Sequence, residues 1–558
     1  MSARQSVERP AGPIRKGFID VDGKTMHYVQ RGSGPALLLL HAAPCSARVM
    51  EPLQAAWGAH FSTFAFDLPG FGLSDAPAGE PVVTAQLADA VIGAAERLGI
   101  TRAMLYGRHT GAGVAIEAAR RRPDFCHFVL TDGYPIFPTP YSEERLAEYL
   151  PPIEPRWDGA HLIWAWFRYR EQHLFWPWDK RTLERRADTD VPDLDFLYRG
   201  TTELLTAGDS YVRVYASAFR HPGLAILDEV KVPVCYGNRP GDSQYRTVPL
   251  YPAHADVRVF PRCHEAAAAE ELSVLLARAP GEVQPPQESR ITTASDKTFR
   301  GYIDLHDGEE IAACHVRGAA LDRRGLPTLF LPDLPGGIDL HVEEIQQLSA
   351  TAAGPIIGFD PWGAGHSVLP ENRQVTVALW ARQALAVLDH FGFAKANIVA
   401  HGTAGAIALA LGKLASNRVA SLLLRSPAVH PDAAHLAEGY APDIRPVWDG
   451  GNFLRLWHHL RDQELWFPWN SPSVSNARRN EPRLDQTALN RRAVLMLRQP
   501  AHYRDIWRVV LSYPVRDEIA AGAHGDLRLT AHPQDLFGPA TIDAAAAMGL
   551  RLQLHAAP

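Results

Sequence analysis

Runs of apolar residues, separated by polar turns rich in glycine and proline, recur along this chain. Ala36–Leu40, Thr63–Phe66 and Ala103–Tyr106 are almost continuously apolar. Runs of this kind predict parallel strands that are covered on both faces. Apolar residues from Thr84 to Leu98 have helical spacing, and Thr84 is a candidate N-cap. This alternation of strand and helix predicts an α/β fold with a mostly parallel, doubly wound sheet.

The pattern occurs twice. The segment FDLPGFGLS from Phe66 matches FDPWGAGHS from Phe359, and the 22 residues from Trp157 share nine identities with those from Trp448. A repeat of this length indicates a duplicated domain rather than a solenoid of short repeats. We therefore expect domains at residues 15–278 and 298–558, a linker at 279–297 and a flexible tail at 1–14.

Composition narrows the possible partners. The chain has 558 residues, 46% of them hydrophobic, which is enough for two sizeable cores. A net charge of -6 argues against nucleic-acid binding. No apolar run approaches the ~20 residues of a membrane helix, and the N-terminus lacks an apolar signal core. The five cysteines form neither a disulfide framework nor a cluster at metal spacing. We expect a cytoplasmic protein that uses no cofactor and no metal.

Five segments of the first copy resemble, in order, the landmarks of a known family. They are LLLLHAAP, FDLPGFGLSD, YGRHTGAGVA, VPVCYGNRPGD and VRVFPRCHE. They resemble the oxyanion loop, the DxxGxGxS turn, the GxSxG nucleophile elbow, the acid strand and the histidine loop of the α/β-hydrolase fold. The resemblance is to its capped branch, which includes epoxide hydrolases, haloalkane dehalogenases and hydroxynitrile lyases. It implies two tandem α/β-hydrolase-like domains, with helical caps at about 134–230 and 427–525.

Both copies depart from the family at the elbow. The nucleophile position holds His109 in the first copy and Gly402 in the second. Glycine has no side chain with which to attack a substrate. The second oxyanion turn reads LPDLPGG, which also departs from the family pattern HGxP. We therefore expect the C-terminal domain to be catalytically inactive and structural.

The resemblance implies a set of reacting groups in the first copy. His264 matches the catalytic histidine, Asp242 matches the acid with Asp132 as the alternative, and the amides of Ala43 and Thr110 match the oxyanion donors. These groups imply acyl-transfer or proton-transfer chemistry, because pre-aimed donors stabilise a developing negative charge whatever group attacks.

Imidazole groups are available near neutral pH in both protonation states. We therefore expect His264, oriented by Asp242, to be the main acid–base group, with His109 as a second base or a donor to the substrate. Covalent catalysis on the imidazole, or on Cys45 or Cys263, stays an alternative.

Residues that differ between the copies are better candidates for substrate contacts than residues that both copies keep. His161 and His173 align with Asn452 and Glu464 in the second copy. The candidate substrate-binding residues are His41, Arg108, Tyr134, His161 and His173. The tryptophans that both caps retain indicate packing or a cap-to-cap contact, as in a dimer fused into one chain, and a homo-oligomer is possible.

The hypothesis is a cofactor-independent enzyme whose N-terminal domain acts on a small apolar or aromatic carbonyl, ester or lactone by acid–base chemistry without serine. A lyase, isomerase or cyclase reaction at the same site is the first alternative. The second is a non-catalytic pair of pseudohydrolases that binds a ligand or acts as a scaffold.

Overall fold

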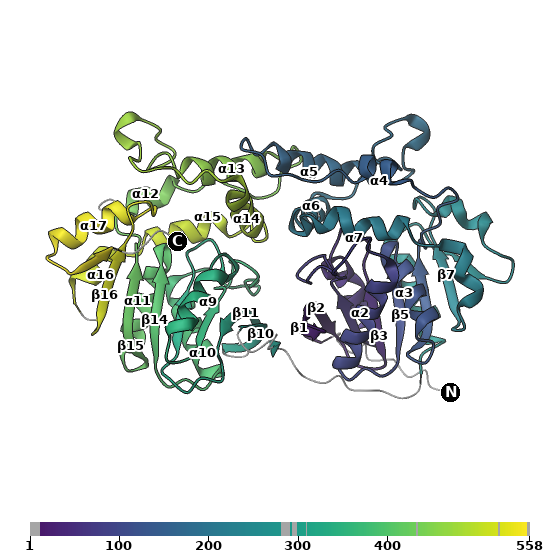
Figure 1. The fold of residues 1–558 in the computed structure, drawn as a ribbon, viewed down its shortest axis with the longest axis horizontal. Coiled ribbons are helices and arrows are strands. Elements are labelled where there is room, and N and C mark those ends of the chain that lie inside the picture. The colour runs from purple at the N-terminus through teal and green to yellow at the C-terminus, as the bar shows by residue number, and fades with distance from the viewer. Residues whose placement is uncertain are drawn as a thin grey trace, which may run out of the picture. The chain divides into compact units, whose positions relative to one another are not determined.

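The structure is a computed structural model that describes residues 12–280, 291–292, 298–307, 310–430, 433–522 and 525–554. The chain divides into two units, residues 1–154 with 164–292 and residues 155–163 with 293–558 (Figure 1). Segment 155–163, expected in the first cap, belongs to the second unit. The expected tail is residues 1–14, of which residues 1–11 lie outside the described ranges. Most of the expected linker, residues 279–297, also lies outside them.

The first unit is built on an eight-stranded sheet in the order β1-β2-β4-β3-β5-β6-β7-β8. Only the pairs β1–β2 and β2–β4 are antiparallel. The central strands β3 and β4 are buried along their whole length, which explains their continuous apolar runs. The strands are β1 (Arg15–Val21), β2 (Lys24–Arg31), β3 (Ala36–Leu40), β4 (Ser62–Phe66), β5 (Ala103–Arg108), β6 (Cys126–Asp132), β7 (Val234–Asn238) and β8 (Asp256–Val259).

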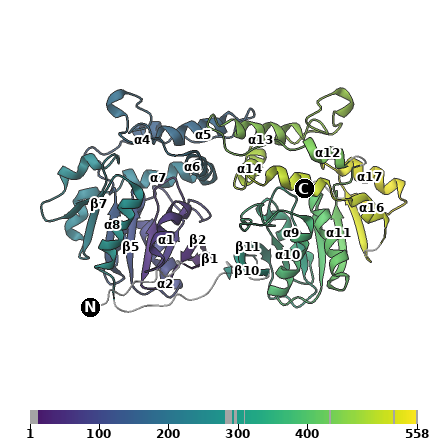
Figure 2. The same cartoon turned by 180° about the vertical axis from the view of Figure 1, so that it is seen from behind.

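Helices cover both faces of this sheet. Helices α2 (Thr84–Arg97) and α3 (Thr110–Arg121) lie on one face, and α1 (Glu51–Trp57) and α8 (His264–Leu276) lie on the other (Figures 1 and 2). The N-cap of α2 is Val83, one residue before the predicted cap. The Thr84 hydroxyl instead lies 3.0 Å from Nδ1 of His221. This side chain therefore makes a tertiary hydrogen bond and does not cap the helix.

A helical cap is inserted between β6 and β7. Its helices are α4 (Glu143–Tyr149), α5 (Ala160–Glu171), α6 (Leu194–Ala207) and α7 (Ser210–Phe219). Aromatic packing holds it together: the guanidinium of Arg168 lies 4.3 Å from the Trp178 ring centroid, and Nε1 of Trp178 donates to the Tyr149 carbonyl at 3.0 Å. Trp178 is therefore a packing residue of the cap, as its presence in both copies suggested.

The second unit repeats this topology. Its strands run in the order β17-β16-β15-β14-β12-β13-β11-β10, and the two-residue strand β9 (Ile291–Thr292) falls at the end of the first unit. The other strands are β10 (Thr298–Asp307), β11 (Glu310–Ala319), β12 (Thr328–Leu331), β13 (Ile356–Phe359), β14 (Ala396–His401), β15 (Val419–Arg425), β16 (Leu527–Ala531) and β17 (Leu552–Leu554). The helices are α9 (Val342–Thr351), α10 (Val377–His390), α11 (Gly405–Leu414), α12 (Ala433–Gly439), α13 (Gly451–Asp462), α14 (Gln486–Met496), α15 (Tyr503–Leu511), α16 (Val515–Ala520) and α17 (Gly538–Ala547).

A buried carboxylate fixes the turn after β4 in the first unit. Oδ2 of Asp67 lies 2.9 Å from Nδ1 of His27, and the carboxylate accepts the amides of Ala47 at 2.6 Å and Leu73 at 2.8 Å. Burial alone would raise the pKa of Asp67, but these partners lower it to about 2. The FDLPGFGLS motif is thus a structural clamp, because its carboxylate ties the turn to the neighbouring oxyanion loop.

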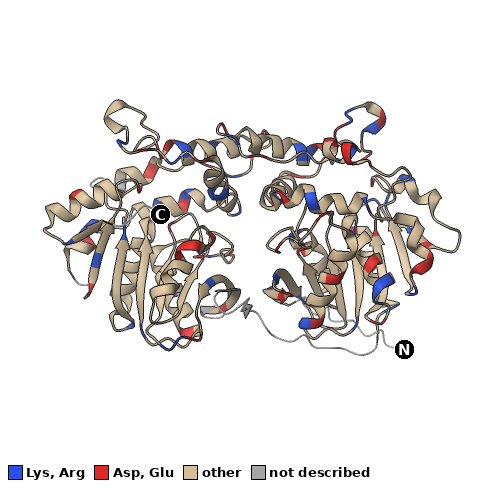
Figure 3. Ribbon diagram, viewed as in Figure 1, with Lys and Arg blue, Asp and Glu red and all other residues tan. Residues whose placement is uncertain are grey.

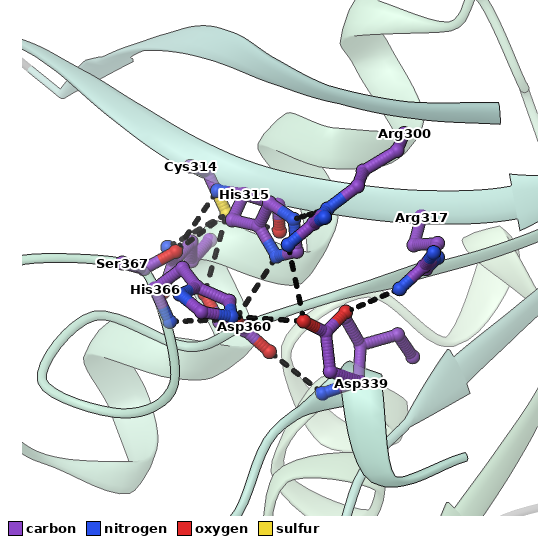
Figure 4. Close-up of polar contacts among 10 residues, drawn as sticks. Arg300, Cys314, His315, Arg317, Asp339, Asp360, His366 and Ser367 are labelled. Atoms are coloured by element: carbon purple, nitrogen blue, oxygen red, sulfur yellow. Dashed lines mark hydrogen bonds and ion pairs between the residues drawn. The ribbon is translucent and has the colours of Figure 1, made fainter. Parts of the chain in front are cut away.

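The second unit has the same clamp around Asp360 (Figure 4). The Asp360 carboxylate lies 3.0 Å from Nδ1 of His315 and accepts the amides of Ile338 at 2.7 Å and His366 at 2.8 Å. Asp339 adds a second carboxylate beside it, with Nε2 of His366 2.8 Å away. The scaffold of the fold is therefore retained in both copies.

Charged residues lie mostly on helices and loops, and the strands are largely uncharged (Figure 3). Among the residues that the structure describes, no helix combines the length and apolarity needed to cross a membrane.

The glycines of α3 give a matched test of the contact between helix and sheet. A Cβ on Gly111 would lie 2.1 Å from the Leu40 carbonyl oxygen, whereas one on Gly113 would meet only ordinary contacts at 3.5 Å. We expect Gly111→Ala to destabilise the first unit by about 1–3 kcal/mol through overpacking. Gly113→Ala should be neutral or stabilising by up to ~1 kcal/mol. Denaturant unfolding followed by tryptophan fluorescence measures both, and equal effects would contradict the close contact.

Candidate active site

The elbow of the first unit places His109 on a sharp turn between β5 and α3. Its backbone has φ 48° and ψ -113°, a strained conformation for a residue other than glycine. The strand and helix come so close that a Cβ on Gly107 would lie 2.3 Å from the Gly111 carbonyl oxygen. This is the geometry of a nucleophile elbow, with an imidazole where the family carries its nucleophile.

His109 pairs with Asp242. Its Nε2 lies 2.8 Å from Oδ2 of Asp242, and the other carboxylate oxygen accepts the Gln244 amide at 2.8 Å. Burial would raise the pKa of Asp242, but the imidazole and these hydrogen bonds hold it well below its usual range. Because an ionised carboxylate only accepts, Nε2 of His109 carries the proton and Nδ1 keeps a lone pair. The His109 side chain is 27% exposed, so solvent reaches it.

His264 pairs with a cation instead of an acid. Its Nδ1 lies 2.6 Å from Nη1 of Arg239. A guanidinium only donates, so Nδ1 must accept and the proton sits on Nε2. Loss of solvation, together with the charges of Arg108 and Arg239, lowers the pKa of His264 to about 4.

The predicted pairing of Asp242 with His264 is therefore wrong. In a catalytic triad the acid accepts from Nδ1–H and leaves the Nε2 lone pair as the base. Arg239 imposes the opposite tautomer on His264, which makes its Nε2–H a donor. The pair with the geometry of a base and its orienting acid is His109–Asp242.

Asp132, the alternative acid, is a counterion for arginines. It is fully buried, it accepts from Nε of Arg239 at 3.1 Å, and it lies 3.3 Å from Nε of Arg108. The Tyr106 hydroxyl donates to it at 3.3 Å. Burial would raise the pKa of Asp132, but the two guanidinium groups lower it. It contacts neither His109 nor His264 with its carboxylate in any hydrogen bond among the described residues.

Ala43 and Thr110, the residues of the expected oxyanion site, lie close together, but the Ala43 amide already makes a hydrogen bond. The Ala43 amide lies 3.3 Å from the Thr110 hydroxyl and donates to it. His41 is fully buried, with Nδ1 3.0 Å from the Ala42 carbonyl and Nε2 accepting the Leu68 amide at 2.9 Å. We predicted that His41 contacts a substrate. It is instead buried and holds the backbone at Ala42 and Leu68 in place.

His173 is the one predicted cap residue that lies near the elbow. Burial lowers its pKa to about 3, with further lowering by the nearby charges of Arg108 and His109. Its ring packs at 5.1 Å from Tyr169 and 5.3 Å from Phe196, centroid to centroid. Aromatic side chains of the cap therefore pack around His173.

Two other predicted contacts have different roles. Tyr134 is fully buried, and its hydroxyl donates to the Gly223 carbonyl at 2.7 Å, so it packs inside the unit. His161 belongs to the second unit, where Nε2 lies 3.0 Å from Oδ1 of Asn490 and the ring packs on Trp457 at 5.0 Å. Periodicity and pairwise comparison of the copies could not separate these packing roles from substrate contact.

The cysteine alternatives lose support. Sγ of Cys45 lies 3.4 Å from the Tyr169 hydroxyl, and burial raises the pKa of this thiol to about 12. A thiol with so high a pKa is a poor nucleophile at neutral pH. Cys263 is exposed, with Sγ 3.6 Å from Oε2 of Glu265.

In the second unit the corresponding space is filled. Oδ1 of Asp333 accepts both the Thr403 amide at 2.9 Å and the Thr403 hydroxyl at 2.8 Å. A Cβ on Gly402 would lie 2.3 Å from the same oxygen. Because Asp333 already accepts the elbow amide, this amide is not free to stabilise an oxyanion, and the inactivity of the second unit stays a prediction.

Sequence reasoning missed two charged residues behind the site. Arg239 lies in the loop after β7, where the only signal was two extra residues before Asp242. Glu271 lies on α8, where it is buried, and its Oε1 makes no hydrogen bond. Burial and the nearby Asp132 raise the pKa of Glu271 to about 8.

Comparisons with known proteins bear on the fold of the chain. No protein-family model matches the chain. It is 32% identical over 157 residues to 2-(acetamidomethylene)succinate hydrolase of Mesorhizobium japonicum, covering 28% of this chain and 53% of that protein. It is 32% identical over 115 residues to an epoxide hydrolase of Caballeronia sordidicola, covering 20% and 35%. The chain thus spans about half or less of the length of these curated relatives.

A solved structure, epoxide hydrolase A from Mycobacterium thermoresistibile, matches 49% of this chain and 100% of its own with a TM-score of 0.36 and 17% identity. The strand order of both sheets, the elbow turns and the sequence relatives define the class: this chain carries two α/β-hydrolase folds in tandem, each with a helical cap.

Glu271 predicts how the stability of the first unit depends on pH. Its pKa rises from 4.5 in a reference peptide to about 8 when folded, so the folded state holds an extra proton between these values. Its contribution to stability is therefore fully present below pH 4.5 and is lost as the pH rises through about 8. We expect Glu271→Gln to reduce this loss, measured by denaturant unfolding across the range. Glu270→Gln, its exposed neighbour on the same helix, is the control. Identical pH profiles of the wild type and Glu271→Gln would contradict the assignment.

Proposed function

We propose that the first unit is a hydrolase-type enzyme in which His109 acts as the general base and Asp242 orients it. The 2.8 Å contact between Nε2 and Oδ2, on a solvent-accessible elbow, carries the proposal. Nδ1 takes a proton from water, and the water oxygen attacks the carbonyl carbon of the substrate. The π pair moves to the carbonyl oxygen. When the intermediate collapses, the leaving group departs with the proton returned from His109.

The surrounding groups have distinct roles in this proposal. Asp242 fixes the tautomer and stabilises the imidazolium that forms. We assign the amides of Ala43 and Thr110 and the Nε2–H of His264 as the donors to the developing oxyanion. The Ala43 amide first has to leave the Thr110 hydroxyl. Thus the imidazole at the elbow replaces serine, and His264 becomes a donor instead of a base.

The substrate class we propose is a small carbonyl, ester or lactone compound with an apolar or aromatic part. Tyr169 and Phe196 beside His173 support the aromatic part. Arg108, 30% exposed next to the elbow, suits a carboxylate on the substrate. The relative named 2-(acetamidomethylene)succinate hydrolase acts, by its name, on a substituted succinate. No cofactor takes part in the proposed reaction, and the second unit is a structural partner.

The His109–Asp242 pair, which we call the dyad, also suits proton abstraction from a substrate without attack by water, as in a lyase, isomerase or cyclase. Its support is that Nδ1 of His109 is a base that needs no covalent step. Product analysis in ¹⁸O-labelled water distinguishes the two reactions, because only hydrolysis incorporates the label.

Loss of the dyad should abolish turnover. With p-nitrophenyl acetate and dihydrocoumarin as probes, we expect His109→Ala and Asp242→Asn to lower kcat by about 10²–10⁴-fold, the usual worth of a general base. His254→Ala and Asp228→Asn are matched controls, because this exposed pair, 3.2 Å apart, is another His–Asp pair of the same unit. Unchanged rates in His109→Ala, or no turnover by the wild type with either probe or with wider ester panels, would favour the pseudohydrolase alternative.

Serine at the elbow should not create a serine hydrolase. We expect His109→Ser to gain no burst of p-nitrophenol, because Arg239 keeps the proton of His264 on Nε2 and no base faces the serine. The circular dichroism spectrum checks that this variant folds. A burst of product with acyl-enzyme seen by mass spectrometry would show that His264 is the base after all.

A further inference from the structure

Three side chains converge at the carboxyl edge of the sheet in the second unit. His341 precedes α9, Glu344 lies in its first turn and His401 ends β14. Nδ1 of His341 is 3.2 Å from Oε2 of Glu344, and Nε2 of His401 is 2.9 Å from Oε1. One nitrogen or oxygen from each residue lies within 4.8 Å of the others. The start of α9 and the end of β14 thus bring two imidazoles and a carboxylate to one point.

The packing around this cluster holds the rings in place. Phe330 lies 5.1 Å from the His341 ring and 5.0 Å from the His401 ring, and the two imidazoles are 4.9 Å apart, centroid to centroid. Nε2 of His401 is buried, yet it makes no hydrogen bond of acceptable geometry. Its neighbour is Oε1 of Glu344 at 2.9 Å, so a bound ion would take the place of this contact.

We propose that His341, Glu344 and His401 form a site for a divalent transition-metal ion, with Zn²⁺ as the reference ion. Two imidazoles favour zinc, cobalt, nickel or copper over magnesium and calcium, which take oxygen ligands. The side chains are 16%, 19% and 18% exposed, so an ion can enter from solvent. Three protein ligands leave one coordination position open for water or a small molecule.

Arg425 competes for this site. Its Nη1 contacts Oε1 of Glu344, so a metal ion has to displace a guanidinium from the carboxylate. The metal ion and the guanidinium of Arg425 repel each other when both are next to the Glu344 carboxylate. This repulsion weakens metal binding in the natural chain. Removal of the Arg425 charge should therefore tighten binding, an effect that a purely structural ion-pair cluster would not produce.

The ligand set belongs to the second copy alone. His401 and Arg425 take the sequence positions of Arg108 and Asp132, the ion pair that flanks the elbow in the first unit. The site is thus independent of the proposed acid–base chemistry. The sequence signal is the His-x-x-Glu spacing from 341 to 344, which is too common to indicate a metal without the tertiary contact to His401.

Isothermal titration of the full-length, metal-free chain with Zn²⁺, followed by metal analysis after dialysis, tests the proposal. We expect one equivalent in the wild type and loss of that equivalent in the double variant His341→Ala/His401→Ala. His458→Ala, an exposed histidine of the same unit, is the control and should keep it. Arg425→Gln should bind Zn²⁺ about tenfold or more tightly than the wild type, a gain of ~1.4 kcal/mol or more.

Co²⁺ titration provides a second measurement, because d–d absorption bands report ligand geometry directly. Bands that appear in the wild type and in Arg425→Gln, and vanish in the double variant, would support the site. Zn²⁺ binding that survives the double variant would show that ions bind surface histidines elsewhere. If neither the wild type nor Arg425→Gln, both folded by circular dichroism, binds Zn²⁺, the cluster is only an ion-pair network and the proposal is wrong.

Discussion

The chemistry of the first unit depends on the close contact between β5 and α3. Glycines at 107 and 111 allow the strand and helix backbones to touch, and the residue between them is forced to positive φ. A strained turn of this kind costs about 1–3 kcal/mol, which the packing of the surrounding sheet and helices offsets. Because of this strain, the side chain of residue 109 projects from the elbow instead of joining the core. Whatever residue stands there faces the space where a substrate would react.

The ion pairs around the elbow then decide which imidazole contacts an acid and which contacts a cation. The guanidinium of Arg239 contacts both Asp132 and His264. Asp132 therefore neutralises Arg239, and His264 faces this guanidinium instead of an acid. The second acid, Asp242, remains for His109. In the reaction that we propose, the usual roles of the family histidine and the elbow residue are therefore exchanged. A single arginine in the loop after β7 accounts for this exchange, because a guanidinium can only donate.

The duplication shows how one scaffold tolerates different chemistry. Both units retain the buried aspartate clamp, at Asp67 and Asp360, because its loss would leave amides and a histidine unpaired in the core. The residues at the strand ends differ between the copies, with Arg108 and Asp132 in the first unit and His401 and Arg425 in the second. In the second unit Asp333 blocks the elbow amide, and a cluster of imidazoles and a carboxylate lies nearby.

The sequence by itself determined the fold class, the duplication and the positions of several strands of the first unit, because apolar runs, glycine-rich turns and the repeated segments are local signals. It also placed His109 at the elbow and Asp242 near the end of β7. Only the tertiary structure decided which acid meets which histidine, that His41 and Tyr134 pack inside the unit, and that His161 belongs with the second unit. These outcomes depend on contacts between residues far apart in the chain. Hydrogen-bond direction and burial at such contacts are set by the three-dimensional packing, which residue type and spacing do not encode.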